Sequence, residues 1–138
     1  MNYLLDSDWI VDYLKGRAPA VQLLQSFAND SLAVSTITYG EVFEGIYYGQ
    51  NRTQIERIFR RFLRGVSVLS VTRQIAYHFA IVRGDLRQRG EIIGDPDILI
   101  AATALHHNLI LVTQNTRHFQ RIPGLLLSQT ISTQDNPK

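Results

Sequence analysis

The sequence predicts an α/β fold, in which helices flank both faces of a mainly parallel sheet of about five strands. Short, almost unbroken apolar runs alternate along the chain with longer segments that have helical periodicity. The apolar runs contain few polar residues, which is typical of strands buried on both faces. Several runs also end in a residue that favours the start of a helix, so strands and helices are expected to follow each other directly.

The first half of the chain is predicted to contain two strands and four helices. The first apolar run ends at Asp6, and a carboxylate there can cap the helix that follows. Thr38 is interpreted as the N-cap of a later helix, with Glu41 as its partner in a capping box. In order along the chain, we predict a strand at 2–5, helices at 7–14 and 20–27, a strand at 32–34, and helices at 38–48 and 52–64.

The second half is predicted to contain three strands and two helices. Asp95 and Pro96 indicate the start of a helix, because aspartate caps helices and proline is favoured in the first turn. The predicted elements are a strand at 66–71, helices at 72–88 and 95–106, and strands at 109–112 and 125–127.

Length and composition favour one soluble domain. A chain of 138 residues is large enough to bury a core without disulfides, and it contains no cysteine. The chain has no signal-like leader, and no apolar run approaches the roughly 20 residues that span a bilayer. We therefore expect a cytoplasmic protein with one domain at 1–128 and a polar tail at 129–138.

Three acidic residues that are far apart in the sequence lie where predicted strands end or helices begin: Asp6, Glu41 and Asp97. Functional sites of parallel α/β sheets lie at the carboxyl ends of the strands. Carboxylates gathered there would repel one another without a cation, and oxygen ligands suit Mg²⁺ or Mn²⁺. Each of the three also has a structural interpretation, as a helix cap or as a partner of the helix dipole.

Positive charge in this chain is almost entirely arginine, although the net charge is only +2. Arginine favours forked contacts to phosphate or carboxylate groups. The segment 52–64 places arginines opposite an apolar helix face, which is compatible with a nucleic acid or an acidic protein as partner. A solvated helix face is the structural alternative. The arginines considered as RNA contacts are Arg57, Arg60, Arg61 and Arg64.

Four stretches together resemble the PIN-domain family, and in particular its VapC-like toxins. The resemblance extends over about residues 2–127, and the last two stretches are the most specific in combination. The four stretches are LLDSD at 4–8, TITYGEV at 36–42, IGDPDILIAA at 93–102 and LVTQNTRHF at 111–119.

The resemblance implies a ribonuclease that depends on Mg²⁺ or Mn²⁺, with Asp6, Glu41 and Asp97 as the acidic residues of the metal site. Asn115 falls where many PIN domains have a fourth acid, and His118 falls where some VapC-like members have another. These departures concern the ligands of a second ion, for which Asp95 is a candidate replacement. Ser7 and Thr113 are expected to support the site by positioning a carboxylate or a water molecule.

The resemblance also implies an RNA substrate, products with a 5′-phosphate and a 3′-hydroxyl, and two protein partners. One partner is a second copy of the chain, because members of the family usually form dimers. The other is a small antitoxin that wraps around the toxin and brings a basic side chain towards the acidic site.

Two other functions are weighed against this one. The pair Asp6 and Asp8 after the first strand is compatible with a haloacid-dehalogenase-like phosphatase, in which Asp6 would be the nucleophile. Such enzymes normally also use a lysine from the middle of the chain, and no lysine lies between Lys15 and Lys138. The second alternative is a PIN-like module that binds nucleic acid or a partner without catalysis, which Asn115 leaves open.

Overall fold

The structure is a computed structural model that describes residues 2–128. The polar tail expected at 129–138 lies outside the described residues. The five strands are β1 (Asn2–Leu5), β2 (Ser31–Ser35), β3 (Val66–Leu69), β4 (Ile110–Val112) and β5 (Leu126–Leu127). The helices are α1 (Ser7–Leu14), α2 (Ala18–Ser26), α3 (Thr36–Tyr47), α4 (Arg52–Leu63), α5 (Arg73–Gln88), α6 (Asp95–His107) and α7 (Thr116–Phe119).

The sheet confirms the predicted α/β architecture. Its order is β3-β2-β1-β4-β5, and all neighbouring strands are parallel. Parallel neighbours need crossover connections, and helices supply most of them here. β1 is central, and its last residue, Leu5, pairs with Val112, the last residue of β4. The residues that follow these two strands therefore emerge side by side at one edge of the sheet.

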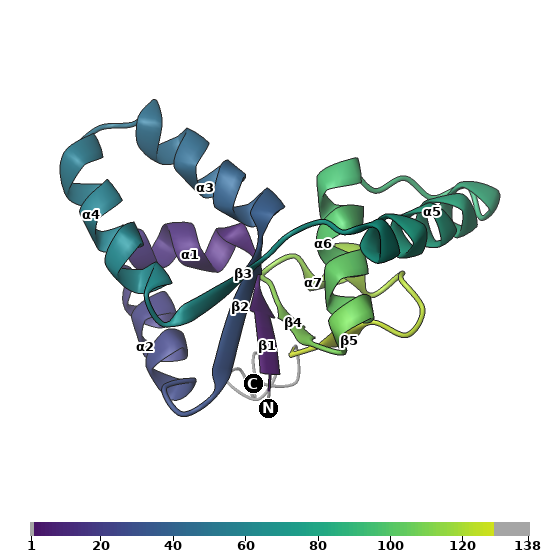
Figure 1. The fold of residues 1–138 in the computed structure, drawn as a ribbon, viewed down its shortest axis with the longest axis horizontal. Coiled ribbons are helices and arrows are strands. Elements are labelled where there is room, and N and C mark those ends of the chain that lie inside the picture. Colours follow the sequence, from purple (N-terminus) through teal and green to yellow (C-terminus); the bar gives the residue numbers. More distant parts are fainter. Residues whose placement is uncertain (1, 129–138) are drawn as a thin grey trace.

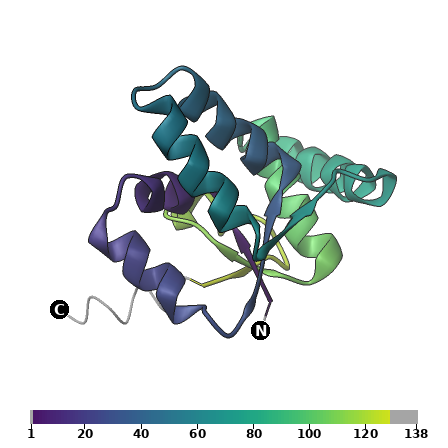
Figure 2. The ribbon, with the colours of Figure 1, turned by 60° about the vertical axis from the view of Figure 1, so that its left-hand side comes forward.

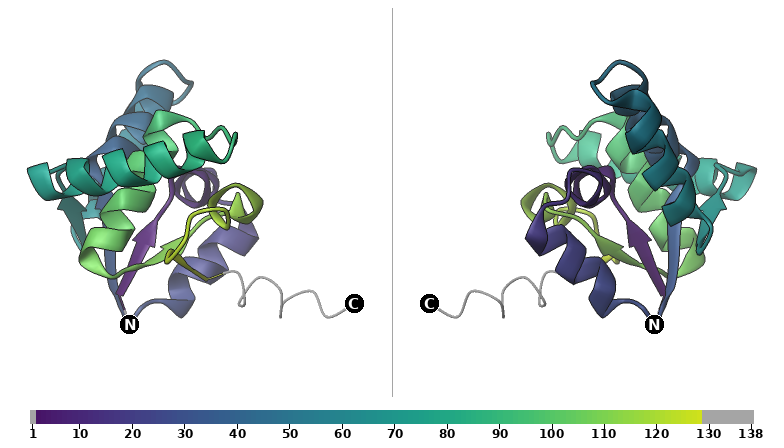
Figure 3. Two further views of the ribbon diagram at one scale, coloured as in Figure 1. Left: turned by 90° about the vertical axis from the view of Figure 1, so that its right-hand side faces the viewer. Right: turned by 90° about the vertical axis from the view of Figure 1, so that its left-hand side faces the viewer.

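Each face of the sheet packs against its own group of helices. Figure 1 shows α1 to α4 on one side of the strands and α5 to α7 on the other, and Figure 3 shows the two groups in turn. Consecutive strand residues point to opposite faces. Leu4 accordingly belongs to the core cluster beneath α5 and α6, whereas Leu5 belongs to the cluster beneath α1 to α4. Both leucines are fully buried, which anchors β1 on both faces.

Helices α3 and α4 lie side by side as a hairpin on one face (Figure 2). Phe59 of α4 is fully buried and contacts Tyr39 and Phe43 of α3 through its ring, with centroids 6.0 and 5.3 Å away. Because aromatic contacts of this kind add to the burial of apolar surface, α4 is firmly attached to α3 through its inner face. Its outer face remains in solvent.

The capping box predicted for Thr38 and Glu41 is wrong. Strand β2 continues to Ser35, and the Ser35 hydroxyl caps α3 by accepting a hydrogen bond from the Ile37 N–H at 3.0 Å. Thr38 lies inside the helix, fully buried, and its hydroxyl has no hydrogen-bond partner among the described residues. Glu41 is consequently not engaged in a helix cap.

Several other boundaries differ from the prediction. Helix α2 starts at Ala18 and includes Pro19, because proline fits the first helical turn. The N-cap of α6 is Gly94 and not Asp95, which is the first residue of the helix. The short helix α7 was not predicted. None of the helices in residues 2–128 combines the length and apolarity needed to cross a membrane.

Candidate metal centre at the carboxyl edge of the sheet

Asp6 occupies the centre of the candidate site. It follows β1 directly, caps α1, and is only 6% exposed. One carboxylate oxygen accepts the Ser7 N–H at 2.8 Å, and the other accepts the Thr113 hydroxyl at 2.7 Å. Thr113 is in place because β4 pairs with β1, and the Asp6 N–H donates to the Val112 carbonyl at 2.9 Å. The sheet register thus orients the Asp6 carboxylate.

Asp8 connects α1 to the loop after β4. Its carboxylate accepts the backbone N–H groups of Trp9 at 2.7 Å and Gln114 at 2.9 Å. The Thr113 hydroxyl also lies 3.2 Å from Asp8, but its single proton is directed to the nearer Asp6. Asp8 was not predicted to belong to the metal site. Its hydrogen bonds show that it fixes the loop carrying Thr113 and Asn115.

Asp97 lies in the first turn of α6 and faces the short helix α7. Its carboxylate Oδ2 is 3.3 Å from Nδ1 of His118. The same Nδ1 is 3.0 Å from the side-chain amide nitrogen of Asn115. One ring nitrogen offers either an N–H or a lone pair, so His118 serves only one of these partners at a time. Asn115 and His118 thus lie together near Asp97. They are the two residues that fall where some PIN-domain proteins have acids.

Glu41 reaches the site from α3. Removal of water by the surrounding protein raises the pKa of Glu41, and the negative charges of Asp97, Glu44 and Asp8 raise it further. Asp97 and Asp8 are therefore close enough to Glu41 for their charges to raise its pKa. The Ser7 hydroxyl is near enough to the Glu41 carboxylate to lower that pKa in part.

Burial raises the pKa of Asp6 to about 7, and the charges of Asp8 and Asp97 add to this effect. The hydrogen bonds from Thr113 and Ser7 act in the opposite direction but are outweighed. Asp97 thus influences both Asp6 and Glu41, as expected if the three acids open onto the same side of the molecule. This electrostatic coupling is consistent with the prediction that the three acids lie near one another.

Asp95 takes part in a different contact. Its carboxylate forms an ion pair with Nε of Arg83 at 2.9 Å, and both side chains are about half exposed. The arginines of α4 line a depression to which Asp6, Glu41 and Asp97 do not contribute. Asp95 therefore has the contacts of a surface residue.

The oxygen-rich site suits a hard divalent cation. Among residues 2–128, no three aspartate, glutamate or histidine side chains lie close enough together to form a complete metal site in this arrangement. Mg²⁺ nevertheless needs only one or two carboxylates, because it retains several of its water molecules. The high pKa of Asp6 shows that its buried negative charge is poorly compensated by the protein alone. The chemistry of Asp6, with Asp97 near enough to raise its pKa, is compatible with such an ion.

Comparisons with known proteins agree with this geometry. The PIN domain model matches residues 3–125. The chain is 35% identical to ribonuclease VapC1 of Haemophilus influenzae strain R2866 over 127 residues, which cover 91% of this chain and 95% of the relative. It is 26% identical to the tRNA(fMet)-specific endonuclease VapC of Shigella flexneri, again covering 91% and 95%.

Two solved structures resemble the whole domain. In VapBC2 from Rickettsia felis, bound to a DNA fragment from the promoter, the matching chain has a TM-score of 0.85 and 29% identity, with 93% of this chain and 98% of that chain covered. In VapBC-1 from nontypeable Haemophilus influenzae the TM-score is 0.80 and the identity 35%, with coverage of 93% and 97%. The chain therefore belongs to the PIN-domain family, and its relatives within that family are VapC ribonucleases.

Proposed function

We propose that this protein is an endoribonuclease and the toxin of a VapBC-type toxin-antitoxin pair. The observation that supports the proposal is that the charge of Asp97 influences both Asp6 and Glu41, in a fold that matches VapC structures. The phosphatase alternative has no such support. Both Asp8 oxygens are engaged by the Trp9 and Gln114 backbone, so Asp8 is poorly placed to act as a general acid.

We further propose that Asp6 and Asp97 hold Mg²⁺ or Mn²⁺, with Glu41 beside them. When bound, such an ion polarises the phosphate and lowers the pKa of a water molecule. The protein's own groups position the ligands: Thr113 donates to Asp6, and the Ser7 hydroxyl lies close to Glu41. Asp8 secures the loop that presents Thr113 and Asn115. These hydrogen bonds keep the carboxylates directed into one site, which is the task of outer-shell residues in metal enzymes.

The purified protein is expected to cleave RNA in the presence of Mn²⁺ or Mg²⁺ and to stop when EDTA removes the ion. Total RNA is the appropriate first substrate, and mapping of the new ends should find 5′-phosphates and 3′-hydroxyls. A protein that binds RNA without turnover at any metal concentration would establish the non-catalytic alternative. Formation of a homodimer stays a prediction, which the molar mass in solution tests.

The identity of the preferred ion depends on His118. Its Nδ1 lies 3.3 Å from the Asp97 carboxylate, and it can offer a lone pair beside this otherwise oxygen-only set when it is not hydrogen-bonded to Asp97 or Asn115. Nitrogen ligands suit transition metals, whereas Mg²⁺ takes oxygen ligands. We therefore propose that this site prefers Mn²⁺ to Mg²⁺.

Replacing His118 by aspartate is expected to reduce the ratio of Mn²⁺ to Mg²⁺ affinity by about 10-fold, because the nitrogen donor is exchanged for oxygen. Metal titrations followed by thermal denaturation measure both affinities without reference to cleavage. Asn115→Asp is the matched control, since it adds the same charge next to the same imidazole. An equal change of the ratio in both variants would show that charge, and not the nitrogen atom, sets the preference.

The antitoxin is proposed to bind in a groove of about 730 Å³ between α1, α3 and α4. Apolar side chains from all three helices line it, including Val11, Val42 and Ile55. A desolvated apolar core is characteristic of stable protein interfaces, and a groove between helices accommodates an amphipathic helix. The solved relatives that contain toxin and antitoxin together support a partner of this kind.

Gly45→Phe tests the groove. Gly45 lines it, and a Cβ added there has no atom within 4 Å, so the backbone accepts a side chain and the phenylalanine is expected to fill the groove. We expect the antitoxin to bind at least about 10-fold more weakly, because its anchor is displaced from a desolvated pocket. Gly84→Phe on α5 is the control, as its surroundings are equally open. Equal affinities of the two variants, measured by calorimetry, would place the antitoxin elsewhere.

A further inference from the structure

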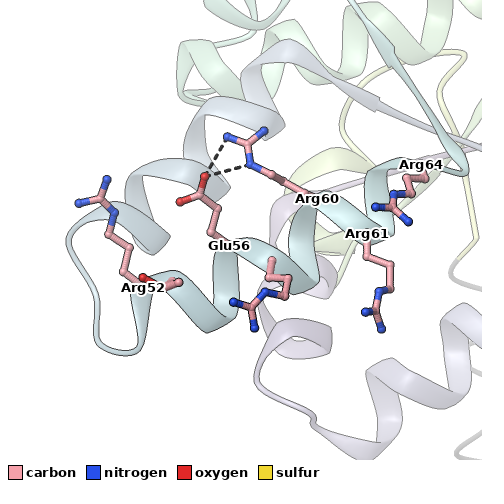
Figure 4. Close-up of a pocket in the computed structure, with 7 residues that line it drawn as sticks. Arg52, Glu56, Arg60, Arg61 and Arg64 are labelled. Carbon is pink, nitrogen blue, oxygen red and sulfur yellow. Dashed lines mark hydrogen bonds and ion pairs between the residues drawn. The ribbon is translucent and has the colours of Figure 1, made fainter.

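The outer face of α4 concentrates positive charge more than any other helix in the described part of the chain. The segment 52–64 contains five arginines and one glutamate, a net charge of +4 in a protein whose total is +2. The remainder of the chain is therefore net negative. An open depression of about 630 Å³ lies between the side chains of this face, lined by α4 and Arg64 alone (Figure 4).

Two of the arginines on this face are held by neighbours. Arg60 forms an ion pair with Glu56 at 2.8 Å and lies over the ring of Phe43, 5.1 Å from its centroid. Arg52 lies over the ring of Tyr47 at 3.8 Å. These contacts restrain the two guanidinium groups, because an aromatic face attracts a cation.

The other three have no carboxylate partner within the described residues: Arg57, Arg61 and Arg64. All three are exposed, and Figure 4 shows Arg61 and Arg64 extending away from the helix. Their spacing of four and three residues places them on one face. At 1.5 Å per residue they extend over about 10 Å along the helix axis. Like charges so close together repel one another, and a multiply charged anion relieves that repulsion.

The character of the surface favours nucleic acid over protein. Threonine, glutamate and arginine line the depression, and no apolar residue contributes to it. Protein interfaces have an apolar, desolvated core, whereas nucleic-acid interfaces are polar and strongly positive. The apolar groove described above is the surface with the features of a protein interface, and it lies on the opposite, inner side of α4.

RNA needs a positively charged surface on this protein, because the candidate active site is itself acidic. The candidate active site contains Asp6, Glu41 and Asp97, whose negative charges oppose the approach of a phosphate backbone. A bound cation offsets part of this charge, and a positive surface elsewhere on the molecule supplies further attraction. We propose that Arg57, Arg61 and Arg64 bind the phosphate backbone of the RNA substrate outside the cleavage site, an inference that rests on the proposed ribonuclease function.

The test compares Arg57→Gln/Arg61→Gln with Arg73→Gln/Arg87→Gln, which removes the same charge from exposed positions on α5. Both pairs are introduced into the Asp97→Asn protein, so that a fluorescent single-stranded RNA is bound and not cleaved. The α4 pair should weaken binding by roughly 10-fold more than the α5 pair at low salt. It should also lower the slope of log affinity against log salt by about 1.4, since each lost phosphate contact of a single strand accounts for about 0.7.

In the active protein the α4 pair should raise the KM for long RNA and leave kcat unchanged, because the chemical step is elsewhere. Equal affinities and salt slopes for the α4 and α5 pairs would overturn the inference. So would normal RNA binding combined with loss of the antitoxin complex, which would assign α4 to an acidic protein. If the unaltered protein cleaves no RNA, the proposed function itself fails, and the binding assay still reports separately on α4.

Discussion

Asp97→Asn is expected to lower the rate of RNA cleavage by about 1000-fold, which corresponds to the several kcal/mol that a bound cation contributes to charge stabilisation. Asparagine has nearly the same shape as aspartate but has no charge with which to hold a cation. The Asp97 side chain is partly exposed and contacts His118, so the fold should persist. Single-turnover cleavage at saturating Mn²⁺ is the appropriate measurement, with circular dichroism as the check on folding.

Asp95→Asn is the matched control for this experiment. Asp95 lies two residues away on the same helix and carries the same charge, but it pairs with Arg83 at the surface. A half-exposed ion pair contributes about 0 to 1 kcal/mol, so this variant should keep its activity within a few fold. If Asp95→Asn were as inactive as Asp97→Asn, Asp95 would regain the role of replacement ligand. Full activity of Asp97→Asn would remove that residue from the mechanism.

Asp6→Asn is expected to abolish cleavage and at the same time to stabilise the metal-free protein at neutral pH. Folding raises the pKa of Asp6 from 3.8 to about 7, mainly through burial. Between these values the folded protein binds more protons than the unfolded chain, so stability falls as the pH rises from about 4 to 7. Above pH 7 the folded state carries the full cost of the buried charge. Asparagine avoids that cost and keeps the acceptor for the Ser7 N–H.

The free energy of unfolding of Asp6→Asn relative to that of the unaltered protein should rise by up to about 4 kcal/mol between pH 4 and pH 8, since one pKa unit corresponds to about 1.4 kcal/mol. Urea denaturation in EDTA across this range measures it. Mn²⁺ should then raise the stability of the unaltered protein and leave Asp6→Asn nearly unchanged, because only the carboxylate gains a counter-ion. A stability difference that is independent of pH would show that the Asp6 charge is not the cause.

Periodicity was sufficient to predict the layered architecture. The apolar runs that contain Leu4, Val34 and Leu111 became parallel strands, because residues of both pleats are buried under helices. Asp6 could be placed near the loop after β4 for a related reason, since parallel strands end at the same edge. Glu41 was grouped with Asp6 and Asp97 because it lies near the start of a predicted helix, and the resemblance to PIN domains supported that grouping.

The sequence could not predict which of two similar neighbouring residues takes a given structural role. Ser35 and Thr38 are both good N-cap residues, and the choice depends on how far β2 extends in contact with β3. Asp95 and Asp97 are likewise equivalent in sequence, and only the packing of α5 against α6 shows that Asp95 meets Arg83. The contact between His118 and Asp97 depends on α7, whose four residues are too few for a periodic signal.

The hydrogen bond from Thr113 to Asp6 joins residues 107 positions apart. On a ribosome that adds about 5–20 residues per second, β1 is made several seconds before its neighbour β4. A nascent toxin therefore carries its first carboxylate long before the hydroxyl that orients it has been synthesised. Chains cut short before β4 should be harmless to the messenger RNA from which they are being translated.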